Sequence, residues 1–409
     1  MTMKKVVRII GRMNGGGPAR QVAYLHHSLR GRFETILVVG AIEPGEQDMR
    51  YLLKDSIGVI EIPSMSRSVK GWSDLVSLVK ITLVLLREKP DIVHTHTAKA
   101  GVLGRIAALV AGVPIRVHTY HGNVFQGYFG KRTSRLIIAV ERLLNRVTTR
   151  VIAISESQAE ELTERFRVAR RDQVAIVKNG FDLKPLADSG QLRRDARRNL
   201  NLNENDFLVV WAGRLVAIKN VPLLREVVHQ TAGIPKVKFL VAGDGPLRED
   251  LTKGASCGNL QVIGWQKDMK LIWAAADVVL LTSRNEGTPA SLIEALAAGK
   301  PFISTAVGGV LDLAKPPVTQ VSNDCRQAAN GFLTPSSPEA IVACIEKLLF
   351  SPRLAKAMGE EGRTFALANY DQERLARELN ELYENLLEHA KIPKRAEILA
   401  SAIGSNANN

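Results

Sequence analysis

Two glutamates, Glu286 and Glu294, are separated by seven residues in the segment SRNEGTPASLIEALAA. An apolar run precedes this segment and predicts a buried strand. A helix is expected to begin near Pro289, because proline is favoured in the first turn. Glu286 then belongs to the loop and Glu294 to the helix, where side chains tilt towards the N-terminus. Both carboxylates are therefore expected to reach the mouth of this helix.

The mouth of this helix predicts an anion site, because its first backbone N–H groups have no partner within the helix. A diphosphate bound there would leave one carboxylate for a sugar and the other for a ribose diol. Alternatively, the glutamates only complement the helix dipole, which is worth about 0.3–1 kcal/mol each. For one isolated glutamate we favour this second interpretation, and the motifs that follow reverse the preference. The residues of the mouth are Gly287, Thr288, Pro289, Ala290 and Ser291.

Two further loops follow predicted strands and carry cations or glycines. In WAGRLVAIKN, Arg214 and Lys219 can swing over the same crevice, and an arginine can bind a phosphate through two hydrogen bonds. Taken alone, these residues could equally be solvated loop cations. In AGDGPLR, Gly243 permits close approach of the backbone to a ligand, although an ordinary strand–helix turn explains it as well. The two loops favour a nucleotide diphosphate as the ligand.

A third glycine loop, GGGP at residues 15–18, follows the first predicted strand. Its amide groups can point inwards at an anion, and the proline then starts a helix. The loop does not read GxGxxG, and no acidic residue closes the second strand. Because both features of a dinucleotide-binding motif are missing, the sequence argues against a nicotinamide-dependent dehydrogenase.

Four histidines lie near one edge of the predicted first sheet, namely His94, His96, His118 and His121. No Asp, Glu or Cys accompanies them, and the chain holds no Asp-x-Asp, so we expect neither a metal site nor a metal-bridged diphosphate. His121 ends a strand beside Gly122 and is the best placed to face the crevice. For the other three, a buried and hydrogen-bonded structural role is equally well supported.

The elements that must position these residues alternate from end to end, because short β-branched runs are followed by helical patterns. Such alternation is typical of βαβ units and parallel sheets. The polar stretch 182–192 divides two such series and predicts an interdomain linker, and the pattern becomes wholly helical between Ser336 and about Ala390. We therefore predict two doubly wound α/β domains, with the ligand in the crevice that faces the carboxyl ends of the strands. The predicted strands are 5–10, 35–39, 59–62, 92–95, 115–119, 151–154, 174–177, 208–211, 238–242, 261–263, 278–281 and 302–305.

The 409-residue chain has an ordinary globular composition, with 45% hydrophobic and 23% charged residues, which excludes collagen-like and wholly disordered proteins. Its three cysteines are widely spaced and fit a reducing cytoplasm. The longest apolar run, 75–86, contains a lysine and is shorter than the about 20 residues that span a bilayer. The amino terminus has too short an apolar run for a signal peptide. We expect a protein that is soluble or lies on a membrane.

The formal charge is +14, and residues 1–190 hold 29 Lys and Arg against 17 Asp and Glu. Most of the positive charge therefore lies on the first half. This asymmetry predicts a polyanionic partner: anionic lipid headgroups, a phosphorylated small molecule or nucleic acid.

Taken together, EGTPASLIEA, GRLVAIKN, GDGPLR and the early GGGPA loop resemble the family 4 glycosyltransferases of the GT-B fold. The resemblance covers nearly the whole chain. It implies two Rossmann-like domains that face a central cleft: an acceptor domain over residues 1–185 and a nucleotide-sugar domain over 186–370. A crossover helix over 371–390 would return to the first domain, and residues 391–409 would form a tail.

The resemblance also implies roles for single residues. Arg214 and Lys219 would bind the donor phosphates, Glu286 the hydroxyls of the transferred sugar, and Glu294 the ribose. His121 matches the family's histidine near the reacting sugar, and with Glu286, Arg214 and Lys219 it would form the catalytic set. The donor site would further include Gly16, Gly17, Gly243, Gly287, Thr288, Pro289, Ala290 and Ser291.

The run HTHTAKAGVLGRIAALVAG and the following HTYHGNVFQGYFG look like bacterial members that build capsule, exopolysaccharide or O-antigen on lipid carriers. The resemblance thus implies a hexosyltransferase that acts with retention of configuration and without metal or cofactor. We expect a UDP-sugar as the donor and a lipid-linked or similar saccharide as the acceptor. One departure is the insertion 315–330, whose role the resemblance does not explain.

Three other interpretations were weighed against the transferase. A sugar-nucleotide epimerase of the same fold would bind the same donor but would need no acceptor. A nucleic-acid-binding protein would fit the basic first half, but aromatic residues make up only 5% and no stacking platform is evident, so we expect no nucleic acid. A non-catalytic scaffold would more often have lost part of the glutamate, arginine and lysine set.

The segment 131–150 predicts a helix with a basic face and an apolar stripe that includes Leu136, Val140 and Leu143. We expect the stripe to pack on the sheet and the cations to lie outside the core. A cytoplasmic leaflet attracts basic residues by about 1 kcal/mol each. The sequence therefore predicts a cytoplasmic protein that can bind peripherally to the inner face of the plasma membrane.

Overall fold

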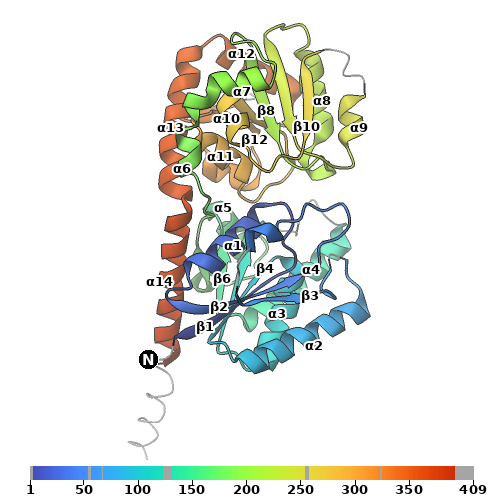
Figure 1. Cartoon of the computed structure of the whole chain (residues 1–409), viewed down its shortest axis with the longest axis vertical. Helices are drawn as coiled ribbons and strands as arrows, with labels where there is room; N and C mark the ends of the chain where they lie inside the picture. Colours follow the sequence, from blue (N-terminus) through green and yellow to red (C-terminus); the bar gives the residue numbers. More distant parts are fainter. Residues whose placement is uncertain are drawn as a thin grey trace, which may run out of the picture.

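A computed structural model describes residues 3–53, 57–66, 68–122, 125, 130–253, 258–322 and 325–391. The chain forms two α/β units stacked one above the other, and a long C-terminal helix runs along the side of both (Figure 1). The predicted two-domain, doubly wound α/β architecture is confirmed.

The N-terminal sheet is wholly parallel and has the order β3-β2-β1-β4-β5-β6-β7. Its central strands are almost continuously buried because helices cover both of their faces. The strands are β1 (Lys4–Ile10), β2 (Phe33–Gly40), β3 (Val59–Ile62), β4 (Ile92–His96), β5 (Ile115–Tyr120), β6 (Arg150–Ala153) and β7 (Val174–Ile176).

Helices on the two faces of this sheet bury opposite sides of the same strands. Helices α2 and α3 pack on Val7 and Ile9 of β1, whereas α1 packs on Val6 from the other side. The helices of this domain are α1 (Gly17–Ser28), α2 (Gly71–Glu88), α3 (Ala98–Val110), α4 (Lys131–Arg146) and α5 (Glu156–Glu160), with the short turns η1 (Arg50–Leu53), η2 (Glu161–Arg165) and η3 (Arg171–Gln173).

The C-terminal sheet has the order β10-β9-β8-β11-β12-β15-β14-β13 and is parallel up to β15. The last two strands form an antiparallel hairpin against β15, and this hairpin is the insertion that the sequence left unexplained. The insertion therefore widens the sheet at its edge. The strands are β8 (Phe207–Ala212), β9 (Val237–Ala242), β10 (Leu260–Gly264), β11 (Val278–Leu281), β12 (Phe302–Thr305), β13 (Thr319–Ser322), β14 (Cys325–Ala328) and β15 (Gly331–Thr334).

The helices in the second half of the chain include the predicted run of helices after Ser336, which is confirmed. They are α6 (Lys184–Ala187), α7 (Arg193–Asn199), α8 (Val221–Gln230), α9 (Arg248–Thr252), α10 (Lys270–Ala275), α11 (Ala290–Ala297), α12 (Pro338–Leu349), α13 (Pro352–Tyr370) and α14 (Gln372–Lys391), with the turns η4 (Ser189–Leu192), η5 (Ala217–Lys219) and η6 (Gly308–Leu313).

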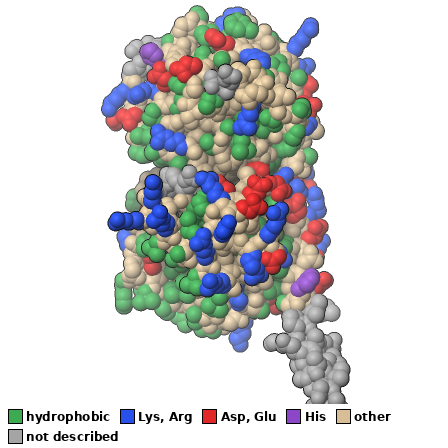
Figure 2. All heavy atoms as spheres, turned by 180° about the vertical axis from the view of Figure 1, so that it is seen from behind, with side chains coloured by type: hydrophobic (Ala, Val, Ile, Leu, Met, Phe, Trp, Pro, Cys, Tyr) green, Lys and Arg blue, Asp and Glu red, His purple; other side chains and the backbone are tan. Residues whose placement is uncertain are grey.

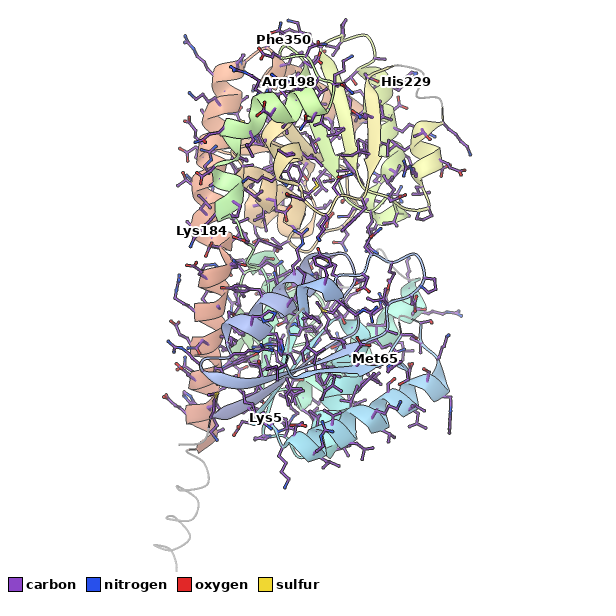
Figure 3. The ribbon with its side chains drawn as sticks, viewed as in Figure 1. Lys5, Met65, Lys184, Arg198, His229 and Phe350 are labelled. Carbon is purple, nitrogen blue, oxygen red and sulfur yellow. The ribbon has the colours of Figure 1, made fainter. Side chains whose placement is uncertain are left out.

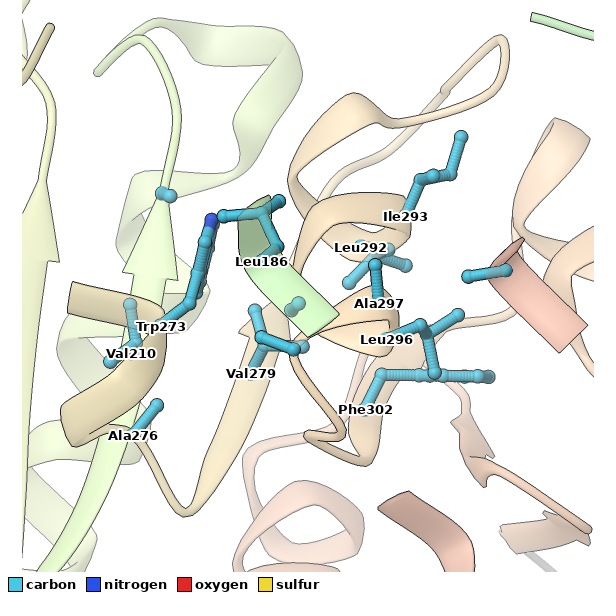
Figure 4. Packing of buried hydrophobic residues seen from close by; sticks show 14 of the residues in the cluster. Leu186, Val210, Trp273, Ala276, Val279, Leu292, Ile293, Leu296, Ala297 and Phe302 are labelled. Atoms are coloured by element: carbon cyan, nitrogen blue, oxygen red, sulfur yellow. The ribbon is translucent and has the colours of Figure 1, made fainter. Parts of the chain in front are cut away.

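The stretch 182–192 connects the last strand of the first sheet to the second domain, and its leucines pack on the C-terminal domain. Leu183 and Leu186 are buried in the C-terminal core, and Ser189 is fully buried. Figure 4 shows Leu186 beside Trp273 and close to α11. Although the stretch is polar on average, Leu183 directly before α6 and Leu186 within it both turn towards the domain and pack on its core.

The final helix α14 crosses back onto the N-terminal domain, as the resemblance implied. Its residues Leu375, Leu379 and Tyr383 pack in the same core as Val6 and Ile92. Lys184, which Figure 3 labels near the junction of the two domains, is bound to this helix through Glu373 at 2.6 Å. The tail predicted to begin at residue 391 lies, from residue 392 on, outside the described residues.

Helix α4 differs from its prediction. Leu136, Val140 and Leu143 do not pack on the sheet but are exposed, and the helix ends at Arg146 rather than at Arg150. Ser134, Glu141 and Asn145 face inwards with Leu144 instead. Glu141 meets the fully buried Arg105 of α3 at 2.7 Å. An ion pair without access to water requires both partners on the inner side, which turns Leu136 and Leu143 outwards.

That network is closed by two more side chains. Asn145 accepts a hydrogen bond from Arg105 at 2.9 Å and donates one to the Tyr120 hydroxyl at 3.1 Å. The same hydroxyl donates to Glu141 at 2.5 Å, and burial raises the pKa of Tyr120. Every member is therefore satisfied, which is the condition for burying such groups.

Candidate active site between the two domains

Glu286 lies in the loop between β11 and α11, as predicted, and it is held on two sides. Lys219, from the turn after β8, forms an ion pair with Glu286 Oε1. Ser283 Oγ donates a hydrogen bond to the same oxygen at 2.5 Å. The structure therefore brings together the carboxylate and one of the two predicted cations.

The mouth of α11 offers unpaired polar groups beside this carboxylate. The helix begins at Ala290, directly after Pro289, and no side chain caps its amide groups. The Thr288 hydroxyl is buried and has no hydrogen-bond partner in the described structure. An orphaned hydroxyl at the positive end of a helix fits a bound anion.

Glycines fix this loop by close backbone contact. A Cβ atom on Gly308 would come within 2.1 Å of the Glu286 carbonyl oxygen, and one on Gly309 within 1.9 Å of the Gly287 carbonyl oxygen. Similarly, a Cβ atom on Gly243 would lie 1.8 Å from the carbonyl oxygen of Gly213. For Gly243 the tight packing of two neighbouring loops is therefore sufficient to explain the glycine.

Arg214 is exposed after β8, and its side chain has no hydrogen bond or ion pair within the described ranges. It differs in this respect from Lys219, which is bound to Glu286. The guanidinium is thus available to a ligand that enters between the domains.

Glu294 has partners that the sequence did not reveal. Arg20 Nη1, from helix α1 of the N-terminal domain, donates to Glu294 Oε1 at 2.5 Å. Trp273 Nε1 donates to Oε2 at 3.2 Å. A ribose diol at Glu294 would have to share one of these oxygens or displace Arg20. The only sequence signal for Arg20 is its place in the first turn after the glycine loop.

The glycine loop of the N-terminal domain lies opposite the C-terminal domain. Gly16 precedes α1, and Gly17 is the first residue of that helix. A Cβ atom on Gly15 would lie 4.0 Å from Trp265 Nε1 of the other domain. A cavity of about 450 Å³ opens nearby, and its walls include Arg20 and Glu294.

His121 directly follows β5 and reaches the second domain. The backbone of the next residue, Gly122, approaches Gly287 so closely that a Cβ atom on Gly122 would lie 3.7 Å from Gly287 Cα. His121 Nε2 lies 3.0 Å from His96 Nδ1, and burial lowers the pKa of His121 to about 4. His121 is therefore neutral at pH 7 and stands next to the loop of Glu286.

The other histidines are buried and bonded to neighbours, which supports the structural role for His94 and His118. His94 bonds to Tyr383 of α14 at 2.6 Å and to Thr119 at 2.7 Å. His118 bonds to Thr95 at 2.8 Å. Burial holds the pKa of His94, His96 and His118 well below the ordinary histidine range.

The pair of His96 and His121 has a preferred proton arrangement. A neutral imidazole carries one N–H, and His96 Nε2 is buried without a partner. The proton of His96 is best satisfied on Nδ1, where it can be donated to His121 Nε2. His121 then carries its own proton on Nδ1.

Within the described ranges, no three His, Cys, Asp or Glu side chains gather in a group that could hold a metal ion. The same residues contain no helix that is both long and apolar enough to cross a membrane.

Two family models together match most of the chain. The model described as Glycosyltransferase Family 4 matches residues 15–185, and that described as Glycosyl transferases group 1 matches residues 193–365. A UDP-Gal:alpha-D-GlcNAc-diphosphoundecaprenol alpha-1,3-galactosyltransferase of Escherichia coli is 33% identical over 63% of this chain and 68% of its own length. The capsular polysaccharide biosynthesis glycosyltransferase CapM of Staphylococcus aureus is 26% identical over 81% of this chain and 87% of its own.

Solved structures share the fold at lower identity. A sucrose-phosphate synthase from Thermosynechococcus elongatus superposes with a TM-score of 0.78 at 20% identity, covering 94% of this chain and 100% of the other. The Anabaena protein Alr3699/HepE, solved in complex with UDP, superposes with a TM-score of 0.74 at 20% identity, covering 93% and 100%. With the matching family models and the relative at 33% identity, these findings show that the chain belongs to the family 4 glycosyltransferases of the GT-B fold.

Proposed function

We propose that this glycosyltransferase moves a hexose from a UDP-sugar to a lipid-linked saccharide, with retention of configuration and without a metal, in the synthesis of a bacterial surface polysaccharide. One observation carries the donor site: the unpaired Thr288 hydroxyl and the mouth of α11 lie beside a carboxylate that Lys219 already holds. This arrangement fits a diphosphate with a sugar attached to it.

The positive groups would act mainly on the leaving diphosphate. Arg214, Lys219 and the amide groups of α11 supply positive charge where negative charge develops as the sugar departs. Helix and side-chain charges can perform this task without a divalent ion, which supports a metal-independent reaction. Glu286 would bind hydroxyls of the sugar, and His121 would donate its Nδ1 proton in a hydrogen bond to the donor.

Retention is supported by how Glu286 is bound. A double displacement needs a free carboxylate under the sugar, whereas Glu286 is paired with Lys219 and accepts a hydrogen bond from Ser283. The leaving diphosphate oxygen can instead take the proton of the acceptor hydroxyl on the same face. The new bond then forms on the side from which the diphosphate leaves.

The choice of substrates is supported by relatives. The galactosyltransferase of Escherichia coli is named for UDP-Gal and a diphosphoundecaprenol acceptor, and Alr3699/HepE was solved with UDP. A lipid-linked acceptor would require the enzyme to work at a membrane. The exposed cations of α4, among them Lys131, Arg132 and Arg135, are suited to bind the anionic inner leaflet of the plasma membrane.

A donor screen with an acceptor control tests the proposal. UDP-, GDP- and ADP-sugars are compared by thermal shift, and a donor at one hundred times its Kd stabilises by about 2.7 kcal/mol. We expect the largest shift with a UDP-sugar, and sugar consumption only when a polyprenyl-diphosphate saccharide is added. Conversion of the UDP-sugar that is independent of acceptor would indicate the epimerase instead.

A further inference from the structure

Helix α2 exposes an apolar stripe that the fold does not use. Its inner side packs on the sheet through Ile81 and Leu85. On the outer side, apolar side chains recur at steps of three and four residues, and Trp72 is 79% exposed. A stripe of this spacing lies along one face of a helix. The exposed members are Trp72, Leu75, Val79, Leu83 and Leu86.

The exposed charges around this stripe are all positive. Both acidic residues of α2 are bound by cations of the N-terminal domain: Asp74 by Lys99, and Glu88 by Lys5 at 3.1 Å. Both carboxylates are also largely buried. The exposed charged residues of α2 and its two ends are cations, namely Lys70, Lys80, Arg87 and Lys89.

The neighbouring helices continue this surface. Helix α3 packs beside α2 on the same face of the sheet and ends in the exposed Leu109 and Val110. Helix α4 lies beside α3, is joined to it through Arg105 and Glu141, and turns Leu136 and Leu143 outwards. Figure 2 shows apolar side chains gathered on the lower part of the N-terminal domain, with Lys and Arg side chains beside them.

We propose that α2 lies in the plane of an anionic membrane leaflet and inserts its outer apolar stripe between the headgroups. An amphipathic helix with apolar residues on one face and cations at its flanks has the character of an interfacial helix. The inference rests on the membrane partner of the proposed function and adds the element that enters the lipid. It also places the docking surface on the α2–α4 layer of the first sheet.

A second copy of the chain fits this face less well than an anionic membrane does. Two copies packed stripe to stripe would bring Lys80 and Arg87 of each close to the cations of the other. Like charges brought together across an interface oppose association. An anionic leaflet supplies the opposite charge along the whole stripe.

Trp72 is a built-in reporter for insertion. Trp211 and Trp273 are fully buried, so the Trp265→Phe variant leaves Trp72 as the exposed indole. With phosphatidylglycerol vesicles we expect a blue shift of the emission and quenching by brominated acyl chains. Unchanged emission while the protein sediments with the vesicles would place α2 outside the lipid and overturn the proposal.

A charge-neutral variant tests the stripe directly. Leu75→Gln, Val79→Gln and Leu83→Gln together change only exposed side chains, so the fold should survive, which circular dichroism checks. We expect affinity for phosphatidylglycerol vesicles to fall by roughly tenfold or more, equivalent to about 1.4 kcal/mol. The binding that persists at high salt should be lost. The matched control is Phe350→Gln, because Phe350 is 76% exposed at the far end of the other domain (Figure 3).

The outcomes separate this inference from the proposed function. Equal vesicle affinity of the triple variant and the wild type contradicts the inference even if sugar transfer is observed. A wild-type dimer that the triple variant dissociates, with vesicle binding unchanged, would assign the stripe to a second copy and contradict it too. Loss of vesicle binding in the triple variant supports it, whether or not the chain transfers sugar to a lipid.

Discussion

At the scale of single residues, the two glutamates of the α11 segment have different surroundings. Glu286 is paired within its own domain, to Lys219 and Ser283, whereas Glu294 is paired across the cleft to Arg20. The sequence could predict both carboxylates from their place after a strand. It could not predict Arg20, because that contact joins residues far apart in the chain and depends on how two domains meet.

Replacing Glu286 should depress turnover more than nucleotide affinity. The Glu286→Gln variant keeps the shape of the side chain but loses the charge that holds Lys219 in place. A charge-assisted hydrogen bond is worth about 1.5–3 kcal/mol, so we expect kcat to fall by roughly one to two decades. Steady-state kinetics and calorimetry with UDP measure the two effects. Weaker UDP binding with unchanged kcat at saturation would contradict the role.

Replacing Glu294 and Arg20 separately distinguishes a ribose ligand from an interdomain contact. We expect Glu294→Ala to weaken UDP binding by roughly tenfold or more, as the loss of a hydrogen bond to a charged group predicts. Arg20→Ala should leave UDP affinity unchanged or raise it, because it frees one oxygen of Glu294. Calorimetry on both variants provides the measurement. A similar loss of affinity in both would show that the ion pair itself, and not the ribose, requires Glu294.

The buried histidines should make the protein sensitive to acid. The pKa of His121 is about 4 in the folded chain, below the about 6.5 of an exposed histidine, because burial disfavours the charged form. Since the unfolded chain binds protons more readily, stability is complete above about pH 6.5 and is lost as the pH falls towards 4. The thermal midpoint should therefore drop between pH 7 and pH 5, and less steeply in His121→Asn. A midpoint that rises on acidification would refute this.

At the scale of elements, hydrophobic patterning predicted where the strands lie but not which face of every helix is buried. The predicted strands 59–62, 278–281 and 302–305 have the bounds of β3, β11 and β12. Helix α4 was oriented wrongly because its periodicity shows two sides but not which one the core accepts. That choice was made by Arg105, a residue of another helix.

The orientation of α4 predicts how two substitutions in this helix change the free energy of unfolding, and the second substitution serves as the control for the first. Glu141→Ala leaves Arg105 buried without its partner, which typically costs about 3–5 kcal/mol. Leu143→Ala removes an exposed leucine of the same helix, so its effect should stay within about 0.5 kcal/mol. Urea unfolding of the two variants measures both free energies. Equal destabilisation, or a larger effect of Leu143→Ala, would mean that α4 buries the side predicted from its periodicity.

At the scale of the whole molecule, the site exists only because two domains face each other. The sequence assigned the glycine loop and His121 to one domain and the cation and glutamate loops to the other. The structure brings them together through the contacts of Gly122 with Gly287 and of Arg20 with Glu294. Helix α14 holds this arrangement from the side and reaches the histidines through Tyr383. Such pairings arise from the docking of the domains and leave no local pattern in the sequence.

The central claim is that this cleft transfers a sugar from a nucleotide donor to a lipid-linked acceptor. The most direct measurement incubates labelled UDP-sugars with a water-soluble polyprenyl-diphosphate saccharide in the presence of EDTA and analyses the product by mass spectrometry and NMR. We expect a product enlarged by one hexose, with the anomeric configuration of the donor, and a rate roughly one to two decades lower for Arg214→Ala. No transfer from any nucleotide sugar, or transfer that Arg214→Ala leaves unchanged, would contradict the account.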